Sequence, residues 1–196
     1  MGGSECVPEA ERSEHGGDGP ERTGESERTD GAERTGEAVR ADRDDRGEQG
    51  EALDLDGLRQ FVREHGLFSW LGLELEALEP GYAVLAAPYD EKITNHAEGG
   101  EDNVHGGIAA TLIDTASGFA LRTTFEQPER AALTTTDLHV SYLRPATDDL
   151  RVEAEVVRAG GSMGVTEASV TSTAPDGEKR EVATGSTSYR LFRGER

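Results

Sequence analysis

The fold of this chain is decided by the stretch Val104-His105-Gly106-Gly107-Ile108-Ala109-Ala110-Thr111-Leu112-Ile113-Asp114-Thr115-Ala116-Ser117-Gly118-Phe119-Ala120-Leu121. Its apolar and small residues recur at helical spacing over a wide face; they occupy positions 108, 109, 112, 113, 116, 119 and 120. A helix with so few polar side chains is expected to be covered on most sides by other structure. Asp114 stands in its middle, where an ionised group is costly unless it has a partner or a function.

The two glycines that open this helix are expected to meet a ligand with their backbone. The free N–H groups at a helix start suit a polarised carbonyl oxygen or an anion. Gly107 and Asp114 are separated by about two turns, or about 10 Å of rise. An oxyanion donor and a catalytic carboxylate must both lie about 3 Å from one reacting group. One helix cannot supply both, whereas two antiparallel copies across a two-fold axis can. The motif therefore predicts a homodimer with two shared sites.

Acidic residues outnumber basic ones along the whole chain. The 196 residues include 40 acidic and 20 basic side chains, and only Lys92 and Lys179 are lysines. A basic surface for nucleic acid is absent, and anionic membranes would repel this chain. Such a composition is typical of organisms that keep molar salt in the cytoplasm, where self-repulsion is screened. Ordinary solubilisation is the alternative, and we favour the halophilic interpretation.

Neither a signal segment nor a membrane span is expected, because no run approaches about 20 apolar residues. The single cysteine, Cys6, excludes an intramolecular disulfide and disfavours a thiolate nucleophile. His96, His105 and His139 share no spacing typical of metal ligands, so no metal site is expected. We expect a cytoplasmic protein.

Residues 1–52 are expected to be a disordered, acidic, low-complexity tail. They contain almost no large apolar side chain and repeat a short Glu-Arg-Thr unit. Such a segment cannot bury enough surface to offset its ordering entropy. A mis-assigned start codon is an alternative explanation. Residues 53–196 are expected to form one domain, because about 145 residues suffice for one core.

The expected order of elements in this domain is a helix, two strands, the long helix and four strands. The first helix is predicted over 54–65 and is ended by Gly66. A Pro80-Gly81 turn joins strands over 71–79 and 82–89. The last four strands are predicted over 133–143, 150–156, 163–172 and 182–191. The fold class is α+β, with one antiparallel β-sheet wrapped around a long central α-helix.

This order resembles the hot-dog fold. The pattern Asn…Val104-His105-Gly106-Gly107-x6-Asp114 resembles the phenylacetate-pathway (PaaI-like) branch of hot-dog acyl-CoA thioesterases, within the 4-hydroxybenzoyl-CoA thioesterase superfamily. The resemblance covers roughly residues 67–192. Further segments that carry it are Leu71-Gly-Leu-Glu-Leu75 with Glu79-Pro80-Gly81, Leu138-x3-Tyr142-Leu143-x-Pro145, and Val156-Val157-Arg158-x-Gly160.

The resemblance implies hydrolysis of an aryl or medium-chain acyl-CoA to the free acid and coenzyme A, without a cofactor. The backbone N–H of Gly106, aided by that of Gly107, would polarise the thioester carbonyl. Asp114 of the other subunit would be the nucleophile or the general base that activates water. The resemblance also implies a homodimer that pairs further into a homotetramer.

Two polar residues correspond to orienting positions of the family. Thr135 matches the Ser/Thr after the helix that orients water or substrate. It alternates with Asp137 and His139, which predicts that the three share one strand face. The family's Asn or Gln before the His-Gly-Gly corresponds to Asn95, with an insertion near residues 98–102, or to Asn103. We favour Asn95.

Four residues are candidates for substrate binding. His105 positions the helix start. Ser117 lies one turn after Asp114 and can bond either that carboxylate or a backbone carbonyl. Arg144 and Arg158 are candidates for the phosphates of coenzyme A, or are plain surface charges.

Two other functions are considered. A non-catalytic hot-dog protein that binds acyl-CoA is the alternative, but a binding module has no need of the buried Asp114. A hot-dog hydratase or dehydratase would pair a histidine with a carboxylate as acid and base, and the sequence lacks that pattern.

Overall fold

The computed structural model describes residues 55–95, 102–174 and 176–193, and the expected tail over 1–52 lies outside these ranges. Six strands form one sheet in the order β1-β2-β6-β7-β8-β5, and neighbouring strands run antiparallel. The elements are α1 (Leu55–Glu64), α2 (Gly66–Leu71), β1 (Glu74–Glu79), β2 (Tyr82–Ala87), η2 (Glu91–Ile93), β3 (Thr94–Asn95), β4 (Asn103–Val104), α3 (Gly106–Arg122), η3 (Pro128–Arg130), β5 (Ala132–Tyr142), β6 (Leu150–Ala159), β7 (Met163–Thr173) and β8 (Lys179–Phe192).

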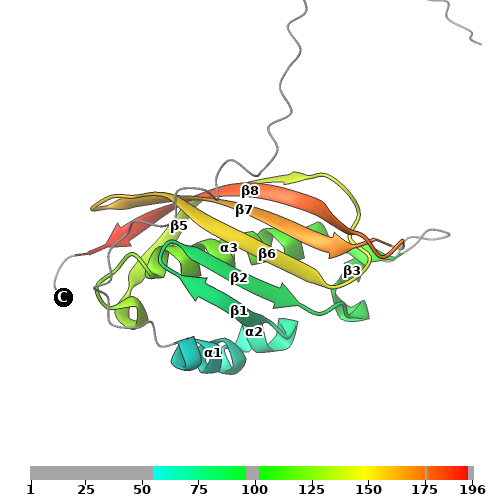
Figure 1. Cartoon of the computed structure of the whole chain (residues 1–196), viewed down its shortest axis with the longest axis horizontal. Helices are drawn as coiled ribbons and strands as arrows, with labels where there is room; N and C mark the ends of the chain where they lie inside the picture. Colours follow the sequence, from blue (N-terminus) through cyan, green and yellow to red (C-terminus); the bar gives the residue numbers. More distant parts are fainter. Residues whose placement is uncertain (1–54, 96–101, 175, 194–196) are drawn as a thin grey trace, which may run out of the picture. The chain divides into compact units, whose positions relative to one another are not determined.

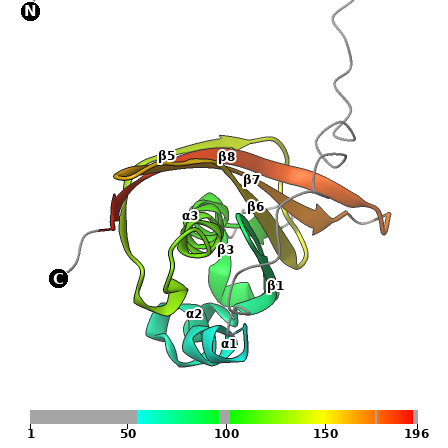
Figure 2. The same cartoon turned by 60° about the vertical axis from the view of Figure 1, so that its left-hand side comes forward.

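The predicted fold class is confirmed. Figure 2 shows the sheet curving over α3, with α1 and α2 on the side that the sheet leaves open. The same layering is visible from the side, with the strands crossing α3 obliquely (Figure 1). α3 has 17 residues, and no helix in the described ranges is long and apolar enough to cross a membrane.

The inner face of the sheet and the apolar face of α3 form the core. Leu150 and Val152 on β6 are buried, as their alternation predicts. Leu112 and Ile113 on α3 are fully covered. Full burial of such a side chain contributes about 1.5–3 kcal/mol to the free energy of unfolding. The apolar face of α3 therefore stabilises the packing of this helix against the sheet.

The N-terminal segment differs from the prediction. α1 ends at Glu64, close to the expected position, but Gly66 begins α2 instead of ending the helical region. The break lies at His65, whose backbone is extended (φ −71°, ψ 125°). The left-handed residue is Gly72 (φ 69°), which ends α2. β1 therefore begins at Glu74 and not at residue 71.

Aromatic rings attach α1 and α2 to the side of α3 that the sheet does not cover. The ring centroids of Phe61, Phe68 and Phe119 lie 6.3–6.5 Å from one another. His65 stacks on Phe68 with a centroid separation of 4.0 Å. Ring pairs at these separations are favourable beyond the area they bury, so the cluster fixes the two short helices against the core.

A β-bulge changes the faces predicted for β5. Thr135 pairs with Tyr189 on β8, but Asp137 pairs with the next residue, Ser188, so one residue of β5 is extra. Thr135 consequently faces α3, whereas Asp137 and His139 lie on the outer face of the sheet. The prediction that these three residues share one face was wrong, because strict alternation does not pass through a bulge.

Candidate active site

Asp114 lies in the middle of α3, half-buried, and two hydroxyl groups meet its carboxylate. Thr135 Oγ1 donates to Asp114 Oδ1 at 2.7 Å. Tyr189 Oη lies 2.7 Å from the same Oδ1 and 2.6 Å from the backbone carbonyl oxygen of Asp114, and can donate to either. The structure thus brings Asp114 and Thr135 together and adds a tyrosine to them.

Tyr189 was missed by sequence reasoning. It is 3% exposed, and its partner across the β5–β8 ladder is Thr135. Burial raises the pKa of its hydroxyl above the ordinary value, and the Asp114 carboxylate raises it further, while a hydrogen bond with Thr135 acts in the opposite direction. Tyr189 is therefore a permanent hydrogen-bond donor at neutral pH. The available signal was its place in the alternating series Thr187, Tyr189 and Leu191, whose members all prove to be buried.

These three residues line a cavity of about 360 Å³, which we call the acid pocket. The aromatic cluster of α1, α2 and α3 forms another part of its wall. Arg122 also lines it, and its guanidinium donates to the backbone carbonyl of Ala131 at 3.0 Å. Burial lowers the pKa of Arg122. The pocket therefore combines one carboxylate, the two hydroxyl groups that contact it, further threonines, one guanidinium and apolar rings, so polar groups that can orient a ligand lie beside an apolar wall.

The start of α3 is fixed by His105, the residue before its first turn. Nδ1 of His105 accepts the N–H of Gly107 at 2.9 Å. A β-carbon at position 107 would lie 2.9 Å from that nitrogen, so only glycine leaves this bond undisturbed. Among the residues that the structure describes, nothing accepts the N–H of Gly106. Of the two amides predicted to act, that of Gly107 is engaged and that of Gly106 is available.

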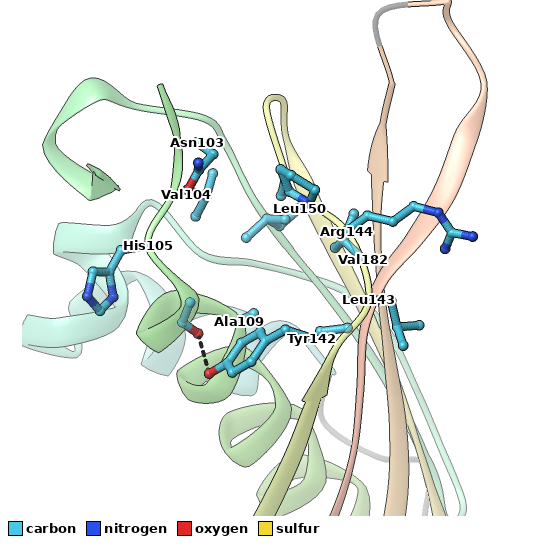
Figure 3. A pocket seen from close by; sticks show the side chains of 13 residues that line it. Asn103, Val104, His105, Ala109, Tyr142, Leu143, Arg144, Leu150 and Val182 are labelled. Atoms are coloured by element: carbon cyan, nitrogen blue, oxygen red, sulfur yellow. Dashed lines mark hydrogen bonds between the residues drawn. The ribbon is translucent and has the colours of Figure 1, made fainter. Parts of the chain in front are cut away.

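Gly106 lines a second cavity of about 350 Å³, which we call the glycine pocket. Tyr142 crosses it and donates its hydroxyl to the carbonyl of Gly106 at 3.0 Å (Figure 3). Apolar side chains form most of the remaining wall, among them Leu143, Leu150 and Val182. The pocket therefore offers a backbone donor at the end of an apolar groove.

The two halves of the predicted site thus lie in different pockets of one chain. Asp114 lines the acid pocket and Gly106 the glycine pocket. Eight positions along α3 separate them, which corresponds to about 12 Å of rise. A single substrate carbonyl cannot reach both within one copy of the chain.

The two candidate asparagines turn out to be direct partners. Asn95 on β3 pairs with Asn103 on β4, and most of the insertion expected near residues 98–102 lies outside the described residues. Asn103 is half-buried and lines the glycine pocket, whereas Asn95 is exposed. Of the two, Asn103 is the one whose side chain borders the same cavity as Gly106.

The other candidates are more scattered. Ser117 is fully buried and accepts a hydrogen bond from Thr166 Oγ1 at 2.8 Å; among the described residues its hydroxyl bonds neither the Asp114 carboxylate nor the backbone carbonyl that was the alternative. Arg144 borders the glycine pocket, but it donates to the Glu181 carbonyl at 2.8 Å, and its guanidinium points away from His105 (Figure 3). Arg158 is exposed on β6 and lines neither pocket.

Comparison with known proteins places the chain in a family. A family model described as the thioesterase superfamily matches residues 101–177. A protein of Halobacterium salinarum, provisionally assigned as an esterase, is 51% identical over 138 residues, which cover 69% of this chain and 91% of that protein. Human acyl-coenzyme A thioesterase 13 is 31% identical over 105 residues, which cover 52% of this chain and 69% of the human protein.

Solved structures of similar fold include proteins of the same family. A thioesterase family protein of Silicibacter pomeroyi is 30% identical, with a TM-score of 0.61 over 70% of this chain and 96% of that chain. The PaaI protein of E. coli is 20% identical and shares the fold, with a TM-score of 0.58 over 71% of this chain and 93% of that chain. The chain belongs to the thioesterase superfamily and is a thioester hydrolase.

Proposed function

We propose that this protein is an acyl-CoA thioesterase that uses Asp114 and the Gly106 amide of two different subunits. One observation carries the proposal. Asp114 is held by two hydroxyl groups in the acid pocket, while the unengaged Gly106 amide borders a separate pocket on the same helix. The similarity to human acyl-coenzyme A thioesterase 13 supports coenzyme A as the thiol part of the substrate.

The chemistry follows from these two groups. The Gly106 N–H donates to the carbonyl oxygen of the thioester and stabilises the negative charge that develops there. Asp114 then acts in one of two ways. As a general base it takes a proton from water, whose oxygen attacks the carbonyl carbon; as a nucleophile it attacks that carbon itself, and water cleaves the resulting anhydride. In both cases the C–S bond breaks, and the products are the free acid and coenzyme A.

A homodimer with antiparallel α3 helices would join the acid pocket of one subunit to the glycine pocket of the other. β5 lies at an edge of the sheet, where its backbone can pair with a second copy. Apolar side chains are exposed there, with Tyr142 58% and Leu143 47% accessible. An exposed apolar edge strand beside an incomplete site supports self-association through this edge, and pairing of two such dimers would give the expected tetramer.

Further proposed roles follow from position. Asn103 would orient the substrate beside Gly106; its position on the wall of the glycine pocket supports it over Asn95. Arg144 remains a candidate for a phosphate of coenzyme A at the rim of that pocket. The aromatic rings of the acid pocket favour an aryl acyl group over a medium-chain one.

The test is the substitution Asp114→Asn, which keeps the size of the side chain and removes its charge. Free thiol is measured with phenylacetyl-, benzoyl-, hexanoyl- and palmitoyl-CoA in molar potassium chloride. We expect a loss of about 1,000-fold or more in kcat with the oligomer intact. The control is Asp56→Asn, whose side chain is 94% exposed on α1. Turnover close to that of the wild type in the Asp114 variant would refute the proposal.

A further inference from the structure

We propose that Tyr189 is a positioning residue that fixes Asp114 by its Oδ1 atom, so that Oδ2 is the oxygen presented to the substrate or to water. This inference rests on the proposed role of Asp114. It assigns a function to a residue outside the 101–177 segment that matches the family model. It also distinguishes the two oxygen atoms of a carboxylate that is symmetric in solution.

The hydrogen bonds around Asp114 carry the inference. The Thr135 and Tyr189 hydroxyl oxygens each lie 2.7 Å from Oδ1; Thr135 donates to it, and the single Tyr189 proton is shared between Oδ1 and the Asp114 carbonyl oxygen. Within the described part of the chain, no donor reaches Oδ2. An oxygen that accepts two hydroxyl protons is less basic and less nucleophilic than one that accepts none, because its lone pairs are already engaged. The reactive oxygen is therefore Oδ2.

Tyr189 also ties this carboxylate to the backbone of α3. Its hydroxyl lies 2.6 Å from the Asp114 carbonyl oxygen, so one group spans the main chain and the side chain of the same residue. Such a contact restricts rotation of the carboxylate about its own bonds. Thr135 alone, with one bond to Oδ1, leaves that rotation open. The phenol is 3% exposed and burial raises its pKa, so it is protonated and able to donate at neutral pH.

Gly118 makes room for the tyrosine. It lies one turn after Asp114 on α3, and a β-carbon there would lie 3.4 Å from the Tyr189 hydroxyl oxygen. A methyl group is tolerated at this distance, but a branched side chain would displace the hydroxyl. We therefore expect a side chain larger than a methyl group at position 118 to crowd the Tyr189 hydroxyl.

The test is Tyr189→Phe, which keeps the ring and removes the hydroxyl. We expect kcat to fall about 10- to 100-fold, the range for losing a hydrogen bond to a charged group, with KM changed less than about twofold. The matched control is Tyr82→Phe, which removes a hydroxyl bonded to Glu153 on the outer surface of the sheet and should leave kcat and KM unchanged.

A second variant covers the case in which Tyr189→Phe does not fold. Gly118→Val retains the tyrosine and is expected to displace its hydroxyl, so the same fall in kcat with little change in KM is expected. A folded variant with wild-type kcat, or one in which KM changes and kcat does not, would overturn the inference. If instead Asp114→Asn retains full activity, the proposed function itself fails, whatever Tyr189→Phe does.

Discussion

Tyr142 lies across the first residue of α3, and it restrains Gly106 in two ways. Its hydroxyl donates to the Gly106 carbonyl at 3.0 Å, and two of its ring carbons lie 3.1 Å from the place where a β-carbon at position 106 would stand. Gly106 carries the amide that is proposed to polarise the substrate, and the Tyr142 ring leaves little room for a side chain at this position.

This contact predicts the effect of Gly106→Ala. The added methyl group must push Tyr142 or the helix start by a few tenths of an ångström, so the N–H no longer points at the substrate carbonyl. We expect kcat/KM to fall about 10- to 100-fold, as for other displaced oxyanion donors. The control is Gly66→Ala at the start of α2, where a β-carbon has no neighbour within 4 Å. Equal activity of the two variants would show that the Gly106 amide is not used.

Subunit mixing tests whether the sites are shared. Asp114→Asn and Gly106→Val chains, each inactive alone, are refolded together in equal amounts. Half of the dimers then contain one chain of each kind. In such a dimer one of the two sites has both Asp114 and Gly106 intact, and the other site has neither. We expect about a quarter of the wild-type specific activity, measured by thiol release. A site contained within one chain predicts no recovery at all.

Tyr189 predicts a dependence of stability on alkaline pH. Burial raises its pKa above the ordinary value of 10.0, so the unfolded chain ionises this group before the folded one does. The protonated phenol contributes fully to the free energy of unfolding below about pH 10. This contribution is lost as the pH rises above that value, by up to about 1.4 kcal/mol per pH unit. The free energy of unfolding should therefore fall more steeply between pH 10 and 11 for the wild type than for Tyr189→Phe. Parallel denaturant titrations of the two proteins, if they gave equal slopes, would contradict this.

The charge of the chain predicts stabilisation by salt. The net charge is −20, and acidic residues lie in every part of the sequence. Potassium chloride at 2 M shortens the screening length to a few ångströms and removes most of this self-repulsion. We expect the thermal midpoint to rise by at least about 3 °C between 0.1 M and 2 M salt. Sorbitol at equal osmolality serves as the uncharged control, and a midpoint that ignores salt would argue for ordinary solubilisation.

Most of the fold could be predicted from the sequence because its signals are local and periodic. The helical spacing of Leu112, Ile113 and Ala116 predicted α3, and the alternation of Leu150, Val152 and Ala154 predicted β6. The errors occur where several local signals compete. Gly66 and Gly72 are both possible helix ends, and the left-handed turn that chooses between them became visible only in the structure.

The candidate site was predictable in part. Asp114 is a carboxylate in an apolar helix, and Gly106 is a glycine at the start of that helix; both depart from the local pattern and are therefore noticeable in the sequence. Tyr189 does not stand out, because a tyrosine in an alternating strand fits any β-sheet. Its role depends on the bulge between Thr135 and Asp137, which sets the register across two strands far apart in sequence. Ser117 shows the reverse case: its spacing from Asp114 was suggestive, yet its hydroxyl turns toward Thr166.

Because Asn95 pairs with Asn103, the position of the start of α3 does not depend on the number of residues between these two asparagines. The β3–β4 pair ends at these two residues. His105 and the first turn of α3 are positioned by β3 and by Ile93, whose carbonyl accepts the His105 N–H at 2.8 Å. Residues can be added or removed between the two asparagines without a change in that anchoring. We therefore expect this segment to accept a grafted recognition sequence next to the reaction centre, with the backbone contacts of His105 unchanged.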